Sequence, residues 1–265
     1  MERRNLALLC AGVVCFWLFA LAFGTAQGKG LRIQPAVQTQ AEPAVQTLTV
    51  IPPQLTLPCR AAILIDQTSG TVLYEMNADQ TMPIASITKV MTLLLTFEAV
   101  HAGRLTMDTA VPVSEHAYHM GGSQIWLEPG EQFTLDEMLK AICVSSANDA
   151  AVAVAELVGG SEPAFVQQMN AKAAELGCTG TNFTCAHGLF DYGNVSTAQD
   201  LAKIAAACAE NQTFAQVAGT ASYVLPATNL RKAEHTISSS NSLMNSESTN
   251  YREYVQWVKG GFTTC

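Results

Sequence analysis

Residues 84–101 read IASITKVMTLLLTFEAVH, and this stretch decides the fold because it is apolar on most sides of a helix. Gly103 follows and gives such a helix a natural end. A helix that is apolar all round has to be covered by other elements. We therefore expect residues 86–101 to form a helix buried at the centre of a domain.

The elements on either side of this helix predict an α+β core with a helical insertion. Residues 61–66 (AAILID) and 71–76 (TVLYEM) are β-type runs joined by a turn that ends in glycine, which is typical of a hairpin. Four helix patterns and then two more β-type runs follow the central helix, an order typical of α+β domains. The expected helices cover residues 134–143, opened by a Thr134–Glu137 capping box, 148–158, 161–176 and 196–210; the later β-type runs cover 222–227 and 254–264.

Composition and charge exclude two classes of protein. Apolar residues make up 49% of the chain and charged residues 14%, a balance that disordered chains do not have. Residues 1–58 contain four basic and two acidic side chains, so residues 59–265 hold 10 basic and 20 acidic ones of the totals of 14 and 22. A domain this acidic offers no basic surface for nucleic acid, and no nucleic-acid partner is expected.

The N-terminal residues have the order of a secretory signal. Arg3 and Arg4 precede an uncharged apolar run at residues 6–23, and the small residues Gly-Thr-Ala at 24–26 then provide a cleavage site after Ala26. The alternative is an uncleaved anchor, because a run of that length can just span a bilayer. We expect residues 1–26 to be a signal peptide, and in either case the bulk of the chain to be exported.

Residues 27–58 have the composition of a linker. The motif PAVQT occurs twice, and Pro52, Pro53 and Pro58 follow. This density of proline disfavours helix and interior strand, so we expect an extended tether, with an edge strand at residues 47–51 (TLTVI) as the alternative. The folded domain is expected to cover residues 59–265.

The cysteine and histidine pattern gives no sign of a metal or another cofactor. Two of the eight cysteines lie in the N-terminal apolar run, and export permits disulfides among the rest. Cys178 and Cys185 are close enough in sequence to bridge across a turn. No CxxC or HExxH pattern occurs, and His116 and His119 lack a third ligand. We expect no metal, and both histidines to be polar surface residues.

Ser86-Ile-Thr-Lys89 places a hydroxyl and an amine three residues apart on one face of a helix turn. A lysine that has lost its proton can take the serine proton, which is the Ser–Lys form of nucleophile activation. The apolar neighbours predict that Lys89 is buried, and burial lowers the pKa of an amine. A serine at a helix start also has its own N–H where a developing oxyanion is stabilised. The plain alternative is a helix N-cap serine followed by a surface lysine.

Two further patterns offer polar groups at defined places. Ser146-Ala-Asn148 lies between two helix patterns in apolar surroundings, although Ser-x-Asn occurs twice more in the chain and a simple helix cap is the alternative. In Lys259-Gly260-Gly261, the glycines leave the backbone open to a ligand or an extended peptide beside a cation. The alternative there is a glycine kink near the chain end.

Taken in the order Ser-x-x-Lys, Ser-x-Asn and Lys-x-Gly, the three patterns resemble those of the exported, low-molecular-mass penicillin-binding D-alanyl-D-alanine carboxypeptidases, relatives of the serine β-lactamases. The resemblance covers residues 59–265. It includes ILIDQTSGTVLYEMNADQTMPIASITKVMTLLL (63–95), GGSQIWLEPGEQFTLDEMLKAICVSSANDAA (121–151) and TNFTCAHGLFDYGNVSTAQDLAKIA (181–205). It implies a β-lactamase/transpeptidase-like fold, in which an antiparallel sheet is flanked by helices and joined by an all-helical subdomain.

The resemblance also implies a substrate and a role for each motif residue. The enzyme would remove the terminal D-alanine from peptidoglycan pentapeptide stems, and β-lactams would inhibit it. It would need no cofactor, and it could act at the outer face of the cytoplasmic membrane. The implied catalytic residues are Ser86 as nucleophile, Lys89 as general base and Ser146 as proton relay. The implied substrate-binding residues are Asn148 for the amide, Lys259 for the carboxylate, Gly261 and Phe262. The N–H groups of Ser86 and Phe262 would form the oxyanion hole.

Two features depart from the family pattern. Gly260 stands where the family has a threonine whose hydroxyl helps to hold the substrate carboxylate, so we expect weaker binding rather than its loss. The chain ends four residues after Gly261, whereas the family continues with two more strands and a helix. Without those elements we expect the strand at 254–264 to have an open edge and the 265-residue chain to be poorly folded.

Two other readings remain open at this point. A class A β-lactamase typically has aspartate in the second motif and a loop with a catalytic glutamate; Ala147 and the absence of an obvious loop of that kind favour the peptidase. A non-catalytic peptidoglycan or β-lactam binder is the other reading, and the retained motif side chains argue against it.

Overall fold

The computed structural model describes residues 57–263. The expected signal peptide at 1–26, most of the expected linker at 27–58 and the alternative edge strand at 47–51 lie outside the described residues. Within residues 57–263, no helix combines the length and the hydropathy that crossing a bilayer requires.

Apart from the helices at Lys89–His101 and Asn148–Gly159, the described α-helices begin at a polar residue whose side chain caps the first turn. Thr134 and Glu137 form the predicted capping box, in which each side chain accepts the backbone N–H of the other residue. Ser161 and Thr197 each accept an N–H from the first turn of the helix that follows. The helices are α1 (Lys89–His101), α2 (Glu115–Tyr118), α3 (Leu135–Val144), α4 (Asn148–Gly159), α5 (Glu162–Glu175), α6 (Ala198–Ala209) and α7 (Gln212–Ala218).

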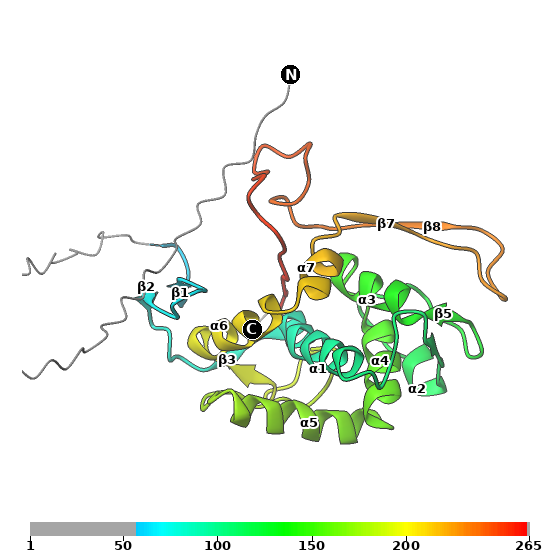
Figure 1. The fold of residues 1–265 in the computed structure, drawn as a ribbon, viewed down its shortest axis with the longest axis horizontal. Helices are drawn as coiled ribbons and strands as arrows, with labels where there is room; N and C mark the ends of the chain where they lie inside the picture. Colours follow the sequence, from blue (N-terminus) through cyan, green and yellow to red (C-terminus); the bar gives the residue numbers. More distant parts are fainter. Residues whose placement is uncertain (1–56, 264–265) are drawn as a thin grey trace, which may run out of the picture. The chain divides into compact units, whose positions relative to one another are not determined.

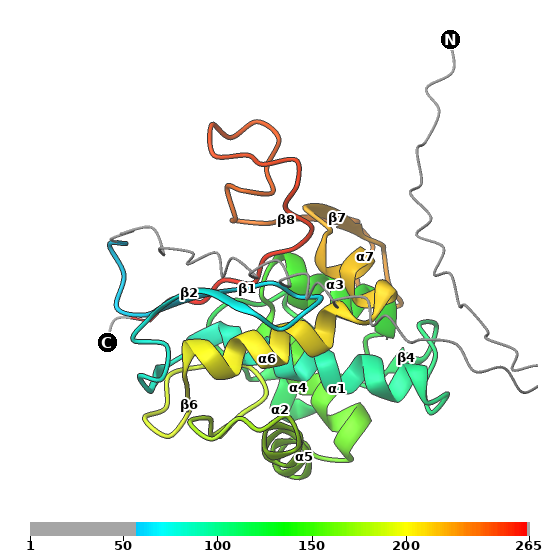
Figure 2. The ribbon, with the colours of Figure 1, turned by 60° about the vertical axis from the view of Figure 1, so that its left-hand side comes forward.

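Helix α1 is the buried centre of the fold, as its apolar sequence predicts. It packs against α4, α5, α6 and α7, which surround it in Figures 1 and 2. Every residue from Lys89 to Phe97 is buried. The helix is preceded by a 3₁₀ turn, η1 (Ala85–Thr88), so that Ser86 lies on the tighter turn and Lys89 opens the α-helix. This arrangement places the Ser-x-x-Lys pattern at the interior end of the central helix.

The strands pair in twos. The predicted hairpin forms between β1 (Ala62–Ile65) and β2 (Val72–Met76), and it lies beside α6 (Figure 2). The expected strand β7 (Ser222–Leu225) pairs with β8 (His235–Ser238) in a hairpin that contacts α3 and extends away from the helices (Figure 1). Helices combined with antiparallel strands confirm the α+β class. Two short pairs have no counterpart in the sequence prediction: β3 (Met82–Pro83) with β6 (Val195–Ser196), and β4 (Ala110–Val111) with β5 (Phe133–Thr134).

The prediction of a strand at residues 254–264 is wrong for the part that the structure describes. Residues 254–263 contain no strand: β1 and β2 pair only with each other, and no described strand pairs with this segment. Side-chain packing holds the segment instead. The Trp257 ring meets the Phe214 ring of α7 edge to face, with 4.8 Å between the ring centroids.

The cysteines and histidines that the sequence analysis singled out have ordinary structural partners. Cys178 and Cys185 are free thiols, so the bridge that their spacing permits is not formed. The Cys185 sulfur accepts the N–H of Gly188. His116 bonds to a glutamate of α5, and the side chain of His119 is exposed. Among residues 57–263, no group of three or more side chains is placed to hold a metal ion.

Candidate active site

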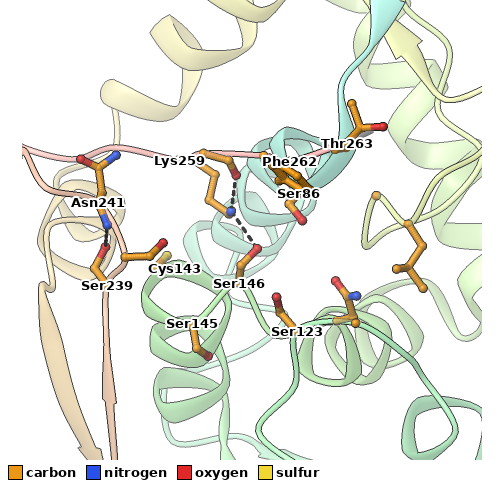
Figure 3. Close-up of a pocket in the computed structure, with 18 of the residues that line it drawn as sticks. Ser86, Ser123, Cys143, Ser145, Ser146, Ser239, Asn241, Lys259, Phe262 and Thr263 are labelled. Atoms are coloured by element: carbon orange, nitrogen blue, oxygen red, sulfur yellow. Dashed lines mark hydrogen bonds between the residues drawn. The ribbon is translucent and has the colours of Figure 1, made fainter. Parts of the chain in front are cut away.

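The three motifs meet at one open cavity of about 750 Å³ (Figure 3). Ser86 reaches it from η1, Ser146 from the link between α3 and α4, and Lys259 from the segment after β8. Lys89 has no exposed surface and lies under the cavity wall next to Ser86. The packing of α1 against α4 brings the Ser86 turn and the Ser146 link to the same cavity, and the segment after β8 adds Lys259.

The Lys89 amine has three hydrogen-bond partners. Its Nζ lies 3.2 Å from Ser86 Oγ and 2.6 Å from Asn148 Oδ1, and it also bonds to the backbone carbonyl of His187. Burial, followed by the positive charge of Lys259, lowers the pKa of Lys89 to about 7. A large fraction of this amine is therefore neutral at pH 7, as the apolar neighbours in the sequence predict.

Lys259 places a second amine on the other side of the cavity. Its Nζ donates to Ser146 Oγ at 2.9 Å and to the Gly260 carbonyl at 2.8 Å, as Figure 3 shows. Burial lowers the pKa of Lys259 to about 8, so at pH 7 it is mostly charged. Ser146 has a φ of 59°, a left-handed conformation that costs a serine about 1–3 kcal/mol and is typical of functional sites.

Asn148 uses both ends of its carboxamide within the protein. Its Oδ1 accepts from Lys89, and its Nδ2 donates to the Gly121 carbonyl at 2.7 Å. The neighbouring Gly122 has a φ of +76°, and a Cβ there would lie 2.7 Å from Asn148 Nδ2. The structure shows Asn148 as a partner of Lys89, and its carboxamide keeps one N–H and one lone pair for the substrate amide that the sequence prediction assigned to it.

Two glycines let backbone segments pack directly on the turn that carries Ser86. A Cβ on Gly188 would lie 2.1 Å from the Ala85 carbonyl oxygen, and a Cβ on Gly261 would lie 2.9 Å from the Ile84 carbonyl oxygen. Gly261 thereby brings Phe262 beside Ser86 (Figure 3). These are the two residues whose backbone N–H groups are expected to form the oxyanion hole. Ala85 itself has a left-handed φ of 45°.

The structure adds cavity residues that the motifs did not identify. Ser239 and Asn241, one of the other two Ser-x-Asn patterns, line the cavity, although the pattern alone did not identify them. The backbone N–H of Asn241 donates to Ser239 Oγ at 3.2 Å. No sequence signal distinguishes a backbone carbonyl such as that of His187 as an active-site group. The further lining residues include Ser123, Cys143, Ser145, Leu189, Phe190, Asp191 and Asn194.

Comparisons with known proteins agree with this geometry. Residues 46–265 match the Peptidase_S11 family model, described as D-alanyl-D-alanine carboxypeptidase. The chain is 46% identical over 161 residues to D-alanyl-D-alanine carboxypeptidase DacF of Bacillus subtilis, covering 61% of this chain and 41% of DacF. It is 33% identical over 216 residues to the D-alanyl-D-alanine endopeptidase of Pseudomonas aeruginosa, covering 80% of this chain and 66% of that protein.

A solved structure supports the same assignment. PBP3 of Streptococcus pneumoniae, a peptidoglycan synthesis regulatory factor, superposes with a TM-score of 0.71 and 31% identity over 79% of this chain and 61% of that one. The chain thus spans about two fifths of DacF and three fifths of PBP3. Because the family model matches most of the chain and the three motifs meet at one cavity, this protein belongs to the D-alanyl-D-alanine carboxypeptidase family of serine peptidases.

Proposed function

We propose that this protein is a serine-type carboxypeptidase that removes the terminal D-alanine from peptidoglycan stem peptides through an acyl-enzyme on Ser86. The hydrogen bonding of Lys89 carries the proposal. A neutral amine has two N–H donors and one lone pair. Asn148 Oδ1 and the His187 carbonyl can only accept, so they use both donors and leave the lone pair for the Ser86 hydroxyl.

Acylation follows from this arrangement. Ser86 Oγ attacks the carbonyl of the penultimate D-alanine while its proton passes to Lys89 Nζ. The N–H groups of Ser86 and Phe262 stabilise the oxyanion. The peptide bond then breaks, and Ser146 relays the proton that Lys89 received to the amine of the departing D-alanine, so Lys89 is neutral and Ser146 is a hydroxyl again. Lys259, which is bonded to Ser146, attracts the carboxylate of that D-alanine.

Deacylation uses the same groups in reverse. Water attacks the ester carbonyl, Lys89 takes a proton from the water, and Ser86 Oγ leaves with its proton restored. A β-lactam presents an equivalent acyl group and carboxylate, so it forms the same ester with Ser86 and inhibits the enzyme. The substrate lies outside the cytoplasm, and the sequence at residues 1–26 supports export as a signal peptide.

Reaction of the folded chain with benzylpenicillin tests this proposal, after circular dichroism has shown whether the 265-residue chain is folded. Intact mass spectrometry should show one added penicilloyl group, peptide mapping should place it on Ser86, and a Ser86→Ala variant should show none. Release of D-alanine from a peptide ending in Lys-D-Ala-D-Ala should be lost in the same variant. An adduct that hydrolyses within seconds would support a β-lactamase instead, and a folded wild-type chain without any adduct would support a non-catalytic binder.

Restoring threonine at position 260 should strengthen substrate binding. A Cβ at Gly260 meets nothing within 4 Å, so the side chain can begin there without a clash. A regained hydroxyl bond to a carboxylate is worth about 1.5–3 kcal/mol, which is about ten- to a hundredfold in kcat/KM for the D-Ala-D-Ala peptide. Gly260→Ser should give part of this gain and Gly260→Val none. Equal rates in the threonine and valine variants would contradict a role for the hydroxyl.

A further inference from the structure

A buried carboxylate on α5 contacts the turn that holds Lys89 but touches none of the proposed reacting groups. Glu162 is 8% exposed. Its Oε1 accepts the N–H of Ala186 at 2.9 Å and lies 3.5 Å from His187 Nε2, and its Oε2 lies 2.7 Å from His116 Nε2. Three partners from α2 and from residues 186–187 thus converge on one carboxylate.

The turn at residues 186–188 connects this carboxylate to both members of the Ser–Lys pair. The Ala186 peptide is held from two sides, because its carbonyl accepts from Thr92 Oγ1 at 2.7 Å. The next carbonyl, of His187, is one of the two acceptors of Lys89 Nζ. Gly188 packs against the carbonyl of Ala85, the residue before Ser86. A shift of this turn would therefore move an acceptor of the base and the support of the nucleophile together.

The protonation of His187 is compatible with this role. Its Nδ1 accepts the N–H of Leu189 at 3.0 Å, so the proton of the neutral ring is on Nε2, which faces Glu162. Burial lowers the pKa of His187 to about 4, so the ring stays neutral at pH 7. The titratable groups that face Glu162 are His116, His187 and the buried thiol of Cys185.

We propose that Glu162 is a positioning residue: by binding the Ala186 N–H it fixes the 186–188 turn, and thereby the His187 carbonyl that holds Lys89 and the glycine that supports Ser86. The inference rests on the proposed function of Ser86 and Lys89. The contact, rather than the negative charge, is what the turn requires.

Two variants separate the contact from the charge. Glu162→Gln keeps an oxygen at the same distance from the Ala186 N–H but removes the charge. Glu162→Asp keeps the charge but withdraws the oxygen by about one C–C bond, or about 1.5 Å, which breaks a 2.9 Å hydrogen bond. Glu175→Gln and Glu175→Asp at the exposed end of the same helix are the matched controls.

Three readouts are measured on the full chain: protection of the Ala186 amide from hydrogen exchange, the pKa of Lys89 from NMR titration of labelled lysine, and the rate of penicillin acylation. The glutamine variant should match the wild type within about threefold in rate. The aspartate variant should lose protection at Ala186, raise the pKa of Lys89 as water enters, and acylate about a hundredfold more slowly, the cost of a misplacement of about 1 Å. The Glu175 variants should change none of these.

An aspartate variant with the wild-type pKa of Lys89 and protected Ala186 would overturn the proposal, as would a glutamine variant impaired as much as the aspartate variant. The first two readouts do not need acylation. If the wild type fails to react with penicillin, the proposed function fails, while amide exchange and the pKa of Lys89 still decide the role of Glu162.

Discussion

Replacing Lys89 with methionine is expected to slow acylation of Ser86 by penicillin about a thousandfold, within the range of about 10²–10⁴ that general-base catalysis contributes. Methionine fills much the same space but has no lone pair to accept the serine proton. The amine is buried and bonded to Ser86 and Asn148, so no water molecule of bulk solvent can take its place directly. The measurement is the second-order rate constant for a fluorescent penicillin.

Lys203→Met is the matched control, since Lys203 lies on α6 and its side chain is partly exposed. Its acylation rate should equal that of the wild type. Circular dichroism should show that both variants are folded. A loss of less than tenfold in Lys89→Met, with the fold intact, would remove Lys89 from the role of general base.

Replacing Gly188 with alanine is expected to damage both folding and acylation. The residue has a φ of +81°, and the new Cβ would lie 2.1 Å from the Ala85 carbonyl oxygen, so the backbone has to move. The left-handed conformation alone costs alanine about 1–2 kcal/mol. We expect the free energy of unfolding to fall by about 3 kcal/mol or more, a cost typical of overpacking in addition to that conformation, and acylation by about a hundredfold because Ser86 shifts.

Gly130 offers a control with the same backbone conformation and no clash. Its φ is +80°, and a Cβ there meets nothing within 4 Å. Gly130→Ala should therefore lose only the conformational cost of about 1–2 kcal/mol and keep the wild-type acylation rate. Chemical denaturation gives the free energies, and the penicillin assay gives the rates. Equal losses of stability in the two variants would contradict the tight packing of the 188 turn on Ala85.

Local sequence signals predicted the parts of the fold that depend on neighbouring residues. The burial of α1 follows from its apolar sequence, the capping box at Thr134 from two polar residues three apart, and the β1–β2 hairpin from a glycine turn between β-type runs. The Ser86–Lys89 contact was predictable for the same reason, since one helix turn brings the two side chains together.

The remaining features depend on contacts between distant segments. The bond from Lys89 to Asn148 joins residues 59 positions apart, and the bond to His187 joins residues 98 positions apart and uses a backbone carbonyl that every residue possesses. The β-type run at 254–264 predicted a strand, but a strand forms only where the segment pairs with another strand, and composition does not show which partner a segment finds. Its aromatic residue packs on α7 instead.

The pH dependence of penicillin acylation tests the central claim, a neutral Lys89 beside Ser86, most directly. Lys89 must be neutral to accept the proton, so the rate rises with pH through its pKa of about 7. Lys259 must be charged to attract the carboxylate, so the rate falls again as pH passes its pKa of about 8. We predict a bell-shaped profile with these two limbs. A rate that keeps rising to an unperturbed lysine value of about 10.4 would contradict the account.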